Sequence, residues 1–204
     1  MARPAKFSTD SILDAAAEAV RERWRGATVA DVAKLLKTPP GSIYYRFESR
    51  DHLFTSLWLR AVERFHQGLL IALTAEDPRQ AALEAAVHVP RFCRDQRREA
   101  IVLTLYRQPE LVTSAPASLR EEVAHVNDEV IAAMVRLAER LYGRAGNREV
   151  ALVAMACQEC PYGLVRSYLR ADEPVPSWLD EAVLASSAAI LDLGAPRTST
   201  PLGG

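Results

Sequence analysis

The sequence predicts an all-α protein that consists of a three-helix head and a helical body of about six helices. Three observations support this fold class. Apolar residues recur three or four positions apart in one segment after another, as they do on the buried side of a helix. Proline and glycine residues separate these segments. With 204 residues, 49% of them hydrophobic, the chain is long enough to bury a substantial core in one or two domains.

Pattern and charge divide the chain into three parts. Residues 1–50 are expected to form the head and residues 51–194 the body. Residues 195–204, with the sequence APRTSTPLGG, are expected to form a disordered tail. Residues 1–50 hold nine Lys and Arg against six Asp and Glu, whereas the remainder holds 16 against 20. A basic head on an acidic body suits a protein that presents one end to phosphate groups.

The first helix of the head is expected to start at Ser8 or Thr9 and to end at Gly26. The arm before it, residues 1–7, carries Arg3 and Lys6, and it is either a disordered terminus or an arm that reaches phosphates or a minor groove. An apolar stripe of the helix is expected to pack under the rest of the head, and it consists of Ile12, Leu13, Ala16, Val20 and Trp24.

Two short helices joined by a tight turn complete the head. The first starts at Thr28, which can cap it together with Asp31, and residues 38–41 (TPPG) end it because neither proline donates a backbone hydrogen bond. The second covers residues 41–47, with Ile43 and Phe47 four positions apart on a buried side. A polar and aromatic outer side on such a helix pair is typical of a helix-turn-helix DNA reader.

This stretch resembles the DNA-binding segment of the TetR family of transcriptional regulators. The residues that carry the resemblance are Thr28, Ala30–Ala33, Gly41–Phe47, Arg50 and Leu53, which span about a quarter of the chain. The turn departs from the family pattern, since many members carry glycine and an apolar residue where this chain has Lys37 and Thr38. A lysine at positive φ is disfavoured, so we expect a slightly different turn geometry.

The resemblance implies that the head contacts DNA. Tyr45 is expected to face the groove, Tyr44 to be half-buried with its hydroxyl on a phosphate, and Arg46 either to read guanine or to bind phosphate. Alternatively, the two tyrosines only pack the small domain. The expected DNA-binding residues are Thr28, Pro40, Gly41, Ser42, Tyr44, Tyr45, Arg46 and Arg50.

The body is expected to begin with a long helix from Arg50 to about Leu73 that has no internal break. A second helix follows from Pro78 to Phe92 or Cys93, then a short helix that ends by Pro109 and a loop over residues 111–116. The later helices cover residues 118–142, 147–170 with a kink at Pro161, and about 178–193.

A ligand pocket between body helices is implied by the family resemblance. Its expected lining combines many apolar groups with few polar ones: Trp58, Phe65, Phe92, Tyr106, Asn127, Met134 and Gln158. Each apolar member could equally be plain core. Asn127 lies inside the apolar stripe of its helix, where it is either a ligand contact or a core asparagine with a partner in the protein.

The resemblance further implies a homodimer that pairs through the last two long helices and binds a palindromic DNA operator in successive major grooves. It would act as a repressor that a small hydrophobic or amphipathic molecule releases. Two alternatives stay open: a sequence-specific DNA binder without small-molecule control, and an all-α metal or redox protein.

The chemistry of an enzyme is only weakly represented. Cys157 and Cys160 form a C-x-x-C without the second pair that a zinc site needs, and His125 with Asp128 and Glu129 supplies too few ligands on one helix. No phosphate-binding loop or nucleophile elbow occurs. We therefore expect no catalytic residue, metal or cofactor, no membrane span, and a cytoplasmic protein.

Overall fold

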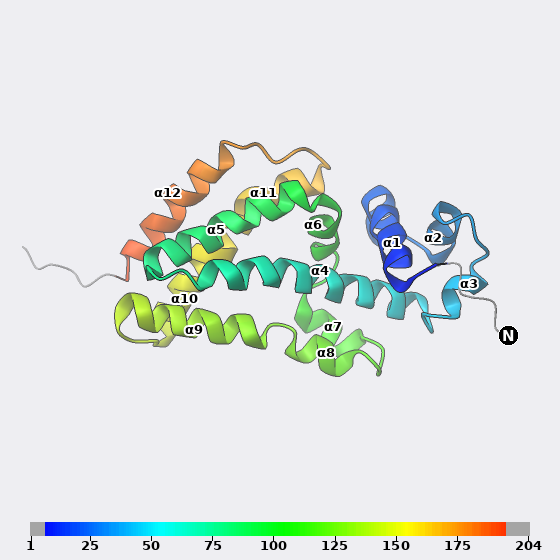
Figure 1. The fold of residues 1–204 in the computed structure, drawn as a ribbon, viewed down its shortest axis with the longest axis horizontal. Helices are drawn as coiled ribbons and strands as arrows, with labels where there is room; N and C mark the ends of the chain where they lie inside the picture. Colours follow the sequence, from blue (N-terminus) through cyan, green and yellow to red (C-terminus); the bar gives the residue numbers. More distant parts are fainter. Residues whose placement is uncertain (1–6, 195–204) are drawn as a thin grey trace, which may run out of the picture. The chain divides into compact units, whose positions relative to one another are not determined.

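The computed structural model describes residues 7–194, and in this range every regular element is a helix, which confirms the all-α fold class (Figure 1). The predicted arm and tail lie largely or wholly outside the described residues. The elements are α1 (Thr9–Arg23), η1 (Trp24–Gly26), α2 (Val29–Leu35), α3 (Gly41–Tyr44), α4 (Arg50–Leu73), α5 (Pro78–Asp95), α6 (Arg97–Leu103), α7 (Gln108–Ser114), α8 (Arg120–His125), α9 (Asp128–Tyr142), α10 (Asn147–Ala154), η2 (Met155–Glu159), α11 (Cys160–Arg170) and α12 (Leu179–Asp192).

The described chain forms two compact units. Unit 1 contains the residues up to Gln67 together with Phe92–Asp128 and Tyr168–Pro174, and unit 2 contains Gly68–Arg91, Glu129–Ser167 and the residues from Val175 onward. The three head helices therefore share unit 1 with the first part of α4 and with α6, α7 and α8. These compact units do not divide at residue 50, and the predicted boundary between a DNA-binding head and a body, which was drawn by function, stays a prediction.

Side-chain caps start the head helices as predicted. The Ser8 hydroxyl accepts a hydrogen bond from the backbone N–H of Ser11 at 3.1 Å. Thr28 and Asp31 form a capping box, in which each side chain accepts a hydrogen bond from the backbone N–H of the other residue. These caps fix where α1 and α2 begin.

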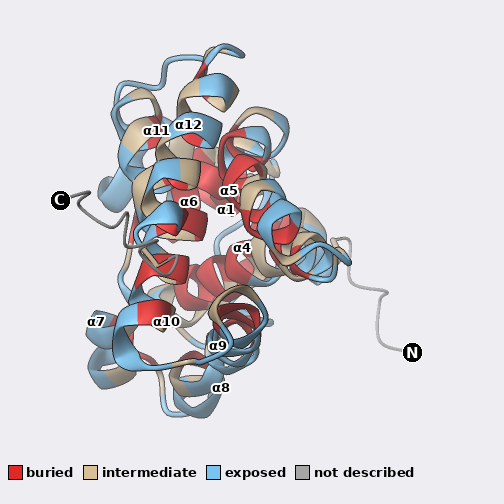
Figure 2. Cartoon of the chain, turned by 90° about the vertical axis from the view of Figure 1, so that its left-hand side faces the viewer, coloured by how far each residue is buried: buried red, intermediate tan, exposed pale blue. Residues whose placement is uncertain are grey.

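The core of unit 1 is built from the predicted apolar sides of these helices, and Figure 2 shows each helix divided into buried and exposed sides. Fully buried side chains of this unit include Ile12, Val20, Val32, Ile43, Leu53, Phe54 and Leu57. Trp24 is an exception to the prediction. It is 46% exposed, because the chain leaves α1 at this residue with a positive φ of 47° and the indole swings outward.

Charged pairs hold α1 to α4 and α6 inside unit 1. The Arg60 guanidinium on α4 lies 2.9 Å from the Asp14 carboxylate on α1, and the buried Glu99 of α6 pairs with Arg64. Arg60 also lies 3.9 Å from Glu99, so this carboxylate sits between two arginines. A buried carboxylate such as that of Glu99 is costly without its partners, so removing the charge of any member of this group should destabilise the protein.

The segment between α6 and α8 corrects the sequence prediction. Residues 111–116 were expected to form a loop after a helix that ends by Pro109, but Gln108–Ser114 is helix α7 and Pro109 lies in its first turn. Proline is well placed there, because the first backbone N–H groups of a helix have no partner inside it. Pro109 does mark a helix boundary, but a helix begins there, whereas the sequence analysis expected one to end there.

The predicted helix over residues 118–142 is divided into α8 and α9 at Val126 and Asn127. The Gln108 side chain donates hydrogen bonds to the carbonyls of Val123 and Ala124, at 2.9 and 2.8 Å. In a continuous helix these carbonyls would accept from the N–H groups four residues later. Gln108 therefore replaces the helical partners that the break removes, and Asn127 donates to the Gln108 side chain at 2.6 Å.

In unit 2, the predicted kink between residues 147 and 170 is a π-helical turn, η2. The backbone N–H of Cys160 donates to the Met155 carbonyl, five residues back, just before Pro161. Inside the same unit, the Ser187 hydroxyl of α12 donates to the Ala156 carbonyl at 2.8 Å, and the Cys157 thiol donates to the Ala82 carbonyl at 3.5 Å. The widened turn thus has buried partners on both α5 and α12.

Two further contacts complete unit 2. The Arg140 guanidinium of α9 donates to the carbonyls of Leu73, Ala75 and Glu76, which fixes the connection from α4 to α5. The Tyr142 hydroxyl donates to the Leu191 carbonyl of α12 at 3.0 Å. Within residues 7–194, no helix is both long and apolar enough to cross a membrane.

The stability of the protein should depend on pH through His66. Burial lowers the pKa of this imidazole from 6.5 to about 4, against a smaller opposing effect of its hydrogen bond to the Val126 backbone. Between pH 6.5 and pH 4 the unfolded state binds more protons, so the free energy of unfolding should fall as the pH falls through this window, by roughly 2 kcal/mol. Urea unfolding measured from pH 7 to pH 4 tests this, and His66→Gln should flatten the profile.

His125→Gln is the matched control for that experiment. His125 is exposed, and the neighbouring Asp128 carboxylate raises its pKa rather than lowering it. The control should keep the acid loss of stability seen in the unchanged protein. If His66→Gln shows the same dependence of stability on pH as the unchanged protein, the acid loss of stability does not come from His66.

The buried carboxylate of Glu99 should contribute strongly to stability. Glu99→Gln removes the charge that compensates Arg60 and Arg64 in a buried position, and it should lower the free energy of unfolding by about 3 kcal/mol. Glu110→Gln, at an exposed site of α7, should change it by less than about 0.5 kcal/mol. Equal unfolding midpoints in urea for the two variants would contradict the prediction.

Candidate nucleic-acid interface

Helix α3 presents the exposed side that the sequence predicted. Ile43 and Phe47 are buried, at 1% and 4% exposure, and they anchor the helix in the core of unit 1. Tyr45 is 86% exposed and Tyr44 is 49% exposed, so both phenol rings are available at the surface. The exposed residues of this segment are Pro40, Gly41, Ser42, Tyr44, Tyr45 and Arg46, all of which the sequence had singled out.

The turn before α3 adopts the geometry that the lysine was expected to disfavour. Lys37 has a φ of 51°, its N–H bonds the Lys34 carbonyl, and the N–H of Thr38 bonds the Ala33 carbonyl. This pattern is a Schellman motif, which usually has glycine at the position of Lys37. The chain therefore forms a turn that glycine usually favours, at the expense of a strained lysine.

Two hydroxyl groups of the predicted interface are already engaged. The Thr28 hydroxyl donates to the Asp31 carboxylate at 2.6 Å, and this bond lowers the pKa of Asp31. The Ser42 hydroxyl accepts from Thr38 at 3.1 Å. Both pairs are at the surface; the Thr28 hydroxyl also accepts from the Asp31 N–H, so it would have to release the Asp31 carboxylate to donate to a phosphate, whereas the Ser42 hydroxyl keeps its own proton for one.

The two arginines of the predicted interface differ in their surroundings. Arg46 is exposed and makes one long hydrogen bond, 3.4 Å, to the Thr9 hydroxyl of α1. Arg50 is half-buried and donates to the carbonyls of Ala27 and Arg25, with its guanidinium 4.8 Å from the centre of the Phe54 ring. Arg50 thus joins α4 to the loop before α2, whereas Arg46 is free to turn toward a ligand.

Sequence reasoning did not assign a role to two cations near this surface. Lys34 and Lys37 are both exposed, one on α2 and one in the turn. Lys34 had entered only the count of basic residues in the head, and Lys37 had otherwise been considered only for the geometry of the turn; the charge count was the signal that could have found both. Cations beside an exposed recognition helix are suited to phosphate contacts.

The residues predicted to bind a small molecule are distributed over both units. In unit 1, Trp58 is buried and its indole N–H has no hydrogen-bond partner among the described residues. Phe65 and Phe92 pack edge to face with ring centres 5.3 Å apart. Tyr106 is half-buried in unit 1, and unit 2 holds the buried Met134 and the half-buried Gln158.

Two cavities in the described residues are lined by other side chains. One, of about 450 Å³, lies between α5 and α12 in unit 2, and the other, of about 370 Å³, lies in unit 1. Asn127, which the sequence left as either a ligand contact or a core asparagine, has a partner inside the protein in Gln108. The predicted ligand residues therefore stay predictions.

The cysteines have the surroundings of packed side chains. Burial raises the pKa values of the Cys93 and Cys157 thiols to about 12, so both are protonated at neutral pH. Cys160 is half-buried, and all three cysteines are free. The described part of the chain contains no group of three His, Cys, Asp or Glu side chains placed to hold a metal ion.

Replacing Lys37 by glycine should stabilise the protein. Glycine adopts a φ near 51° without strain, so Lys37→Gly should raise the free energy of unfolding by about 1 kcal/mol, or the melting temperature by roughly 2–4 °C. Lys37→Ala is the matched control, because it removes the same charge and keeps a side chain at the strained position. Calorimetry that gives the same melting temperature for both variants would contradict this assignment of strain.

A family model matches the N-terminal part of this chain. Residues 12–57 match the family model described as bacterial regulatory proteins, tetR family, and this confirms the resemblance predicted from Thr28–Arg50. No curated protein matches the sequence significantly.

Solved structures with the same fold cover nearly the whole chain. The TetR family regulator PfmR from Thermus thermophilus has a TM-score of 0.68 at 17% identity, over 89% of this chain and 97% of that one. A transcriptional regulator from Rhodococcus sp. Rha1 has a TM-score of 0.69 at 18% identity, over 91% and 97%. The regulator FadR from Bacillus subtilis, solved in complex with stearoyl-CoA, has a TM-score of 0.57 at 18% identity, over 92% and 97%.

Proposed function

Because the N-terminal segment and the fold are those of the TetR family of transcriptional regulators, we propose that this protein is a repressor. It binds a palindromic operator as a homodimer, and a small hydrophobic or amphipathic molecule releases it. This function places the protein in the cytoplasm, together with the chromosome.

The observation that carries the proposal is the exposure of α3. Two exposed tyrosines and an exposed arginine lie next to one another at the end of this short helix, and together they form the aromatic and cationic surface that a helix-turn-helix reader presents to DNA. Ile43 and Phe47 hold this helix rigidly from below, so Tyr45 and Arg46 are presented on a firm support. Tyr45 is assigned to base contacts in the major groove, and Lys34, Lys37 and Arg46 are assigned to phosphates or to guanine.

Dimerisation is proposed through the last two long helices, α10–α11 and α12. Both carry apolar side chains that unit 2 leaves exposed: Met155, Tyr162 and Leu184. Exposed Ala185 and Ala189 on α12 would let a second helix approach closely. Two copies joined in this way would place two α3 helices on half-sites roughly 34–36 Å apart.

Ligand control is supported by one feature of unit 1. The buried Trp58 indole N–H lacks a hydrogen-bond partner among the described residues, and a bound molecule with an acceptor atom would supply it. FadR, a structural neighbour, was solved with an acyl-CoA. A ligand releases the operator only if it binds the DNA-incompetent arrangement of the heads more tightly.

A second candidate, a DNA-binding protein without small-molecule control, is favoured by other observations. Phe65 packs on Phe92 and Asn127 pairs with Gln108, so these predicted ligand residues already have partners inside the protein. Thermal melts against a compound library separate the two candidates. Only the first predicts a compound that raises the melting temperature and weakens operator binding together.

The operator itself is found by selection of random genomic fragments with the purified protein near physiological salt, followed by competition with non-specific DNA. A shared palindrome bound about a thousand-fold more tightly than non-specific DNA would support the proposal. Weak, salt-sensitive binding without a shared site would contradict it.

Tyr45→Ala should reduce selectivity between the operator and its point variants by roughly tenfold at the contacted base pair, because base contacts carry the sequence information. Lys34→Ala is the matched comparison on α2. It should weaken the binding of operator and of non-specific DNA alike, and it should reduce by about one the number of ions released on binding, which the salt dependence of the affinity measures. An unchanged specificity profile for Tyr45→Ala, measured by competition binding, would mean that another side of the head reads the DNA.

A further inference from the structure

The cavity of about 370 Å³ in unit 1 lies between α1, η1, α6 and the last turn of α11. Its walls are apolar, since Val20, Ile101 and Leu169 line it with side chains that are at most 5% exposed. Its volume lies in the range of small-molecule sites. None of the residues proposed above to bind DNA or a releasing ligand belongs to it.

Strained backbone surrounds this cavity. The described residues include three non-glycine positions with positive φ, and two of them, Trp24 at 47° and Asp172 at 51°, line the cavity. The conformation of Trp24 is unfavourable for a bulky side chain, and its indole N–H donates to the Thr104 hydroxyl at 3.2 Å, which fixes the ring at the rim. Such strain tends to persist where a binding site uses it.

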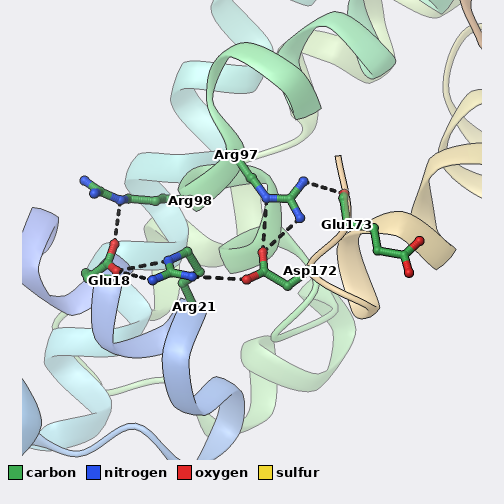
Figure 3. A network of polar contacts seen from close by, with 6 residues as sticks. All are labelled: Glu18, Arg21, Arg97, Arg98, Asp172 and Glu173. Atoms are coloured by element: carbon green, nitrogen blue, oxygen red, sulfur yellow. Dashed lines mark hydrogen bonds and ion pairs between the residues drawn. The ribbon is translucent and has the colours of Figure 1, made fainter. Parts of the chain in front are cut away.

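Two residues that line the cavity, Arg21 and Asp172, belong to an ion-pair network, which Figure 3 shows. Arg21 of α1 lies 2.6 Å from Glu18 and 3.1 Å from Asp172, and Asp172 also accepts from Arg97 of α6 at 2.9 Å. The Arg98 guanidinium lies 2.7 Å from the second carboxylate oxygen of Glu18. The two carboxylates are therefore fully engaged with arginines of the protein.

One cation at the cavity has no such partner. Arg170, in the last turn of α11, lines the cavity, is exposed, and makes no hydrogen bond or ion pair with any residue of the described part. The Glu173 carboxyl group is directed away from the network, and only its backbone carbonyl accepts from Arg97, at 2.6 Å (Figure 3). Four arginines thus meet two carboxylates here, and of these arginines Arg170 alone has no carboxylate partner among the described residues.

We propose that this cavity binds a small carboxylate with an apolar body. Arg170 receives the carboxylate, for which its planar guanidinium is well suited, and Val20, Ile101 and Leu169 enclose the apolar part beside Trp24. The site goes beyond the proposed function, because it stands whether or not an operator is found. Its occupant contacts α1 of the head and α6 at the same time.

The test titrates the full chain with octanoate and benzoate, and with octanol and benzyl alcohol as neutral matches. Heat of binding reports affinity, and tryptophan fluorescence reports the site. Octanoate should bind more tightly than octanol, and Arg170→Gln should weaken octanoate by about tenfold while octanol is unchanged. Trp24→Phe should abolish most of the fluorescence response and keep the heat of binding.

Arg166→Gln is the matched control, since Arg166 is an exposed arginine one turn earlier on α11 and does not line the cavity. It should bind octanoate like the unchanged protein. The proposal is overturned by any of three results: no carboxylate binding at millimolar concentration, equal affinity for octanoate and octanol, or equal effects of the Arg170 and Arg166 substitutions.

Discussion

The attachment of α1 by charged pairs is the interaction on which the head depends. Three of its six buried residues are alanines, and Ile12, Leu13 and Val20 supply the large apolar side chains, so the core holds the helix in place while the charged pairs help to set its orientation. Asp14 at one end pairs with Arg60 of α4, and Glu18 and Arg21 at the other end pair with Arg98 of α6 and with Asp172. Because α2 packs against this helix and α3 packs against α2, its orientation is passed on to the exposed tyrosines.

Local patterns predicted the parts of the fold that are locally determined. The Thr28 cap, the unbroken α4 and the burial of Ile43 and Phe47 follow from residues within one or two helical turns of each other. The break between α8 and α9 does not, because the side chain that replaces the missing helical bonds is Gln108, about fifteen residues away. Trp24 was placed in the core for a similar reason: periodicity continues past the point at which the backbone turns out of the helix.

The candidate site was predictable to the extent that it resembles a known segment. That resemblance singled out the exposed residues of α3, and the structure presents them on a firmly packed helix. It could not reveal that Arg50 is held by two backbone carbonyls, since those contacts come from a loop more than twenty residues earlier. The cavity beside Trp24 escaped detection altogether, because its lining comes from α1, α6 and α11, which no local pattern connects.

The π-helical turn η2 has a consequence for how this chain can change over evolutionary time. Such a turn holds one residue more than an α-helical turn, so the side chains after it are rotated by about 100° relative to a regular continuation. Losing one residue there would restore a regular helix and move Cys157 or its neighbours off their contacts with α5 and α12. The length of residues 155–159 is therefore constrained more tightly than their identities, and insertions or deletions in related sequences should avoid that segment even where substitutions accumulate.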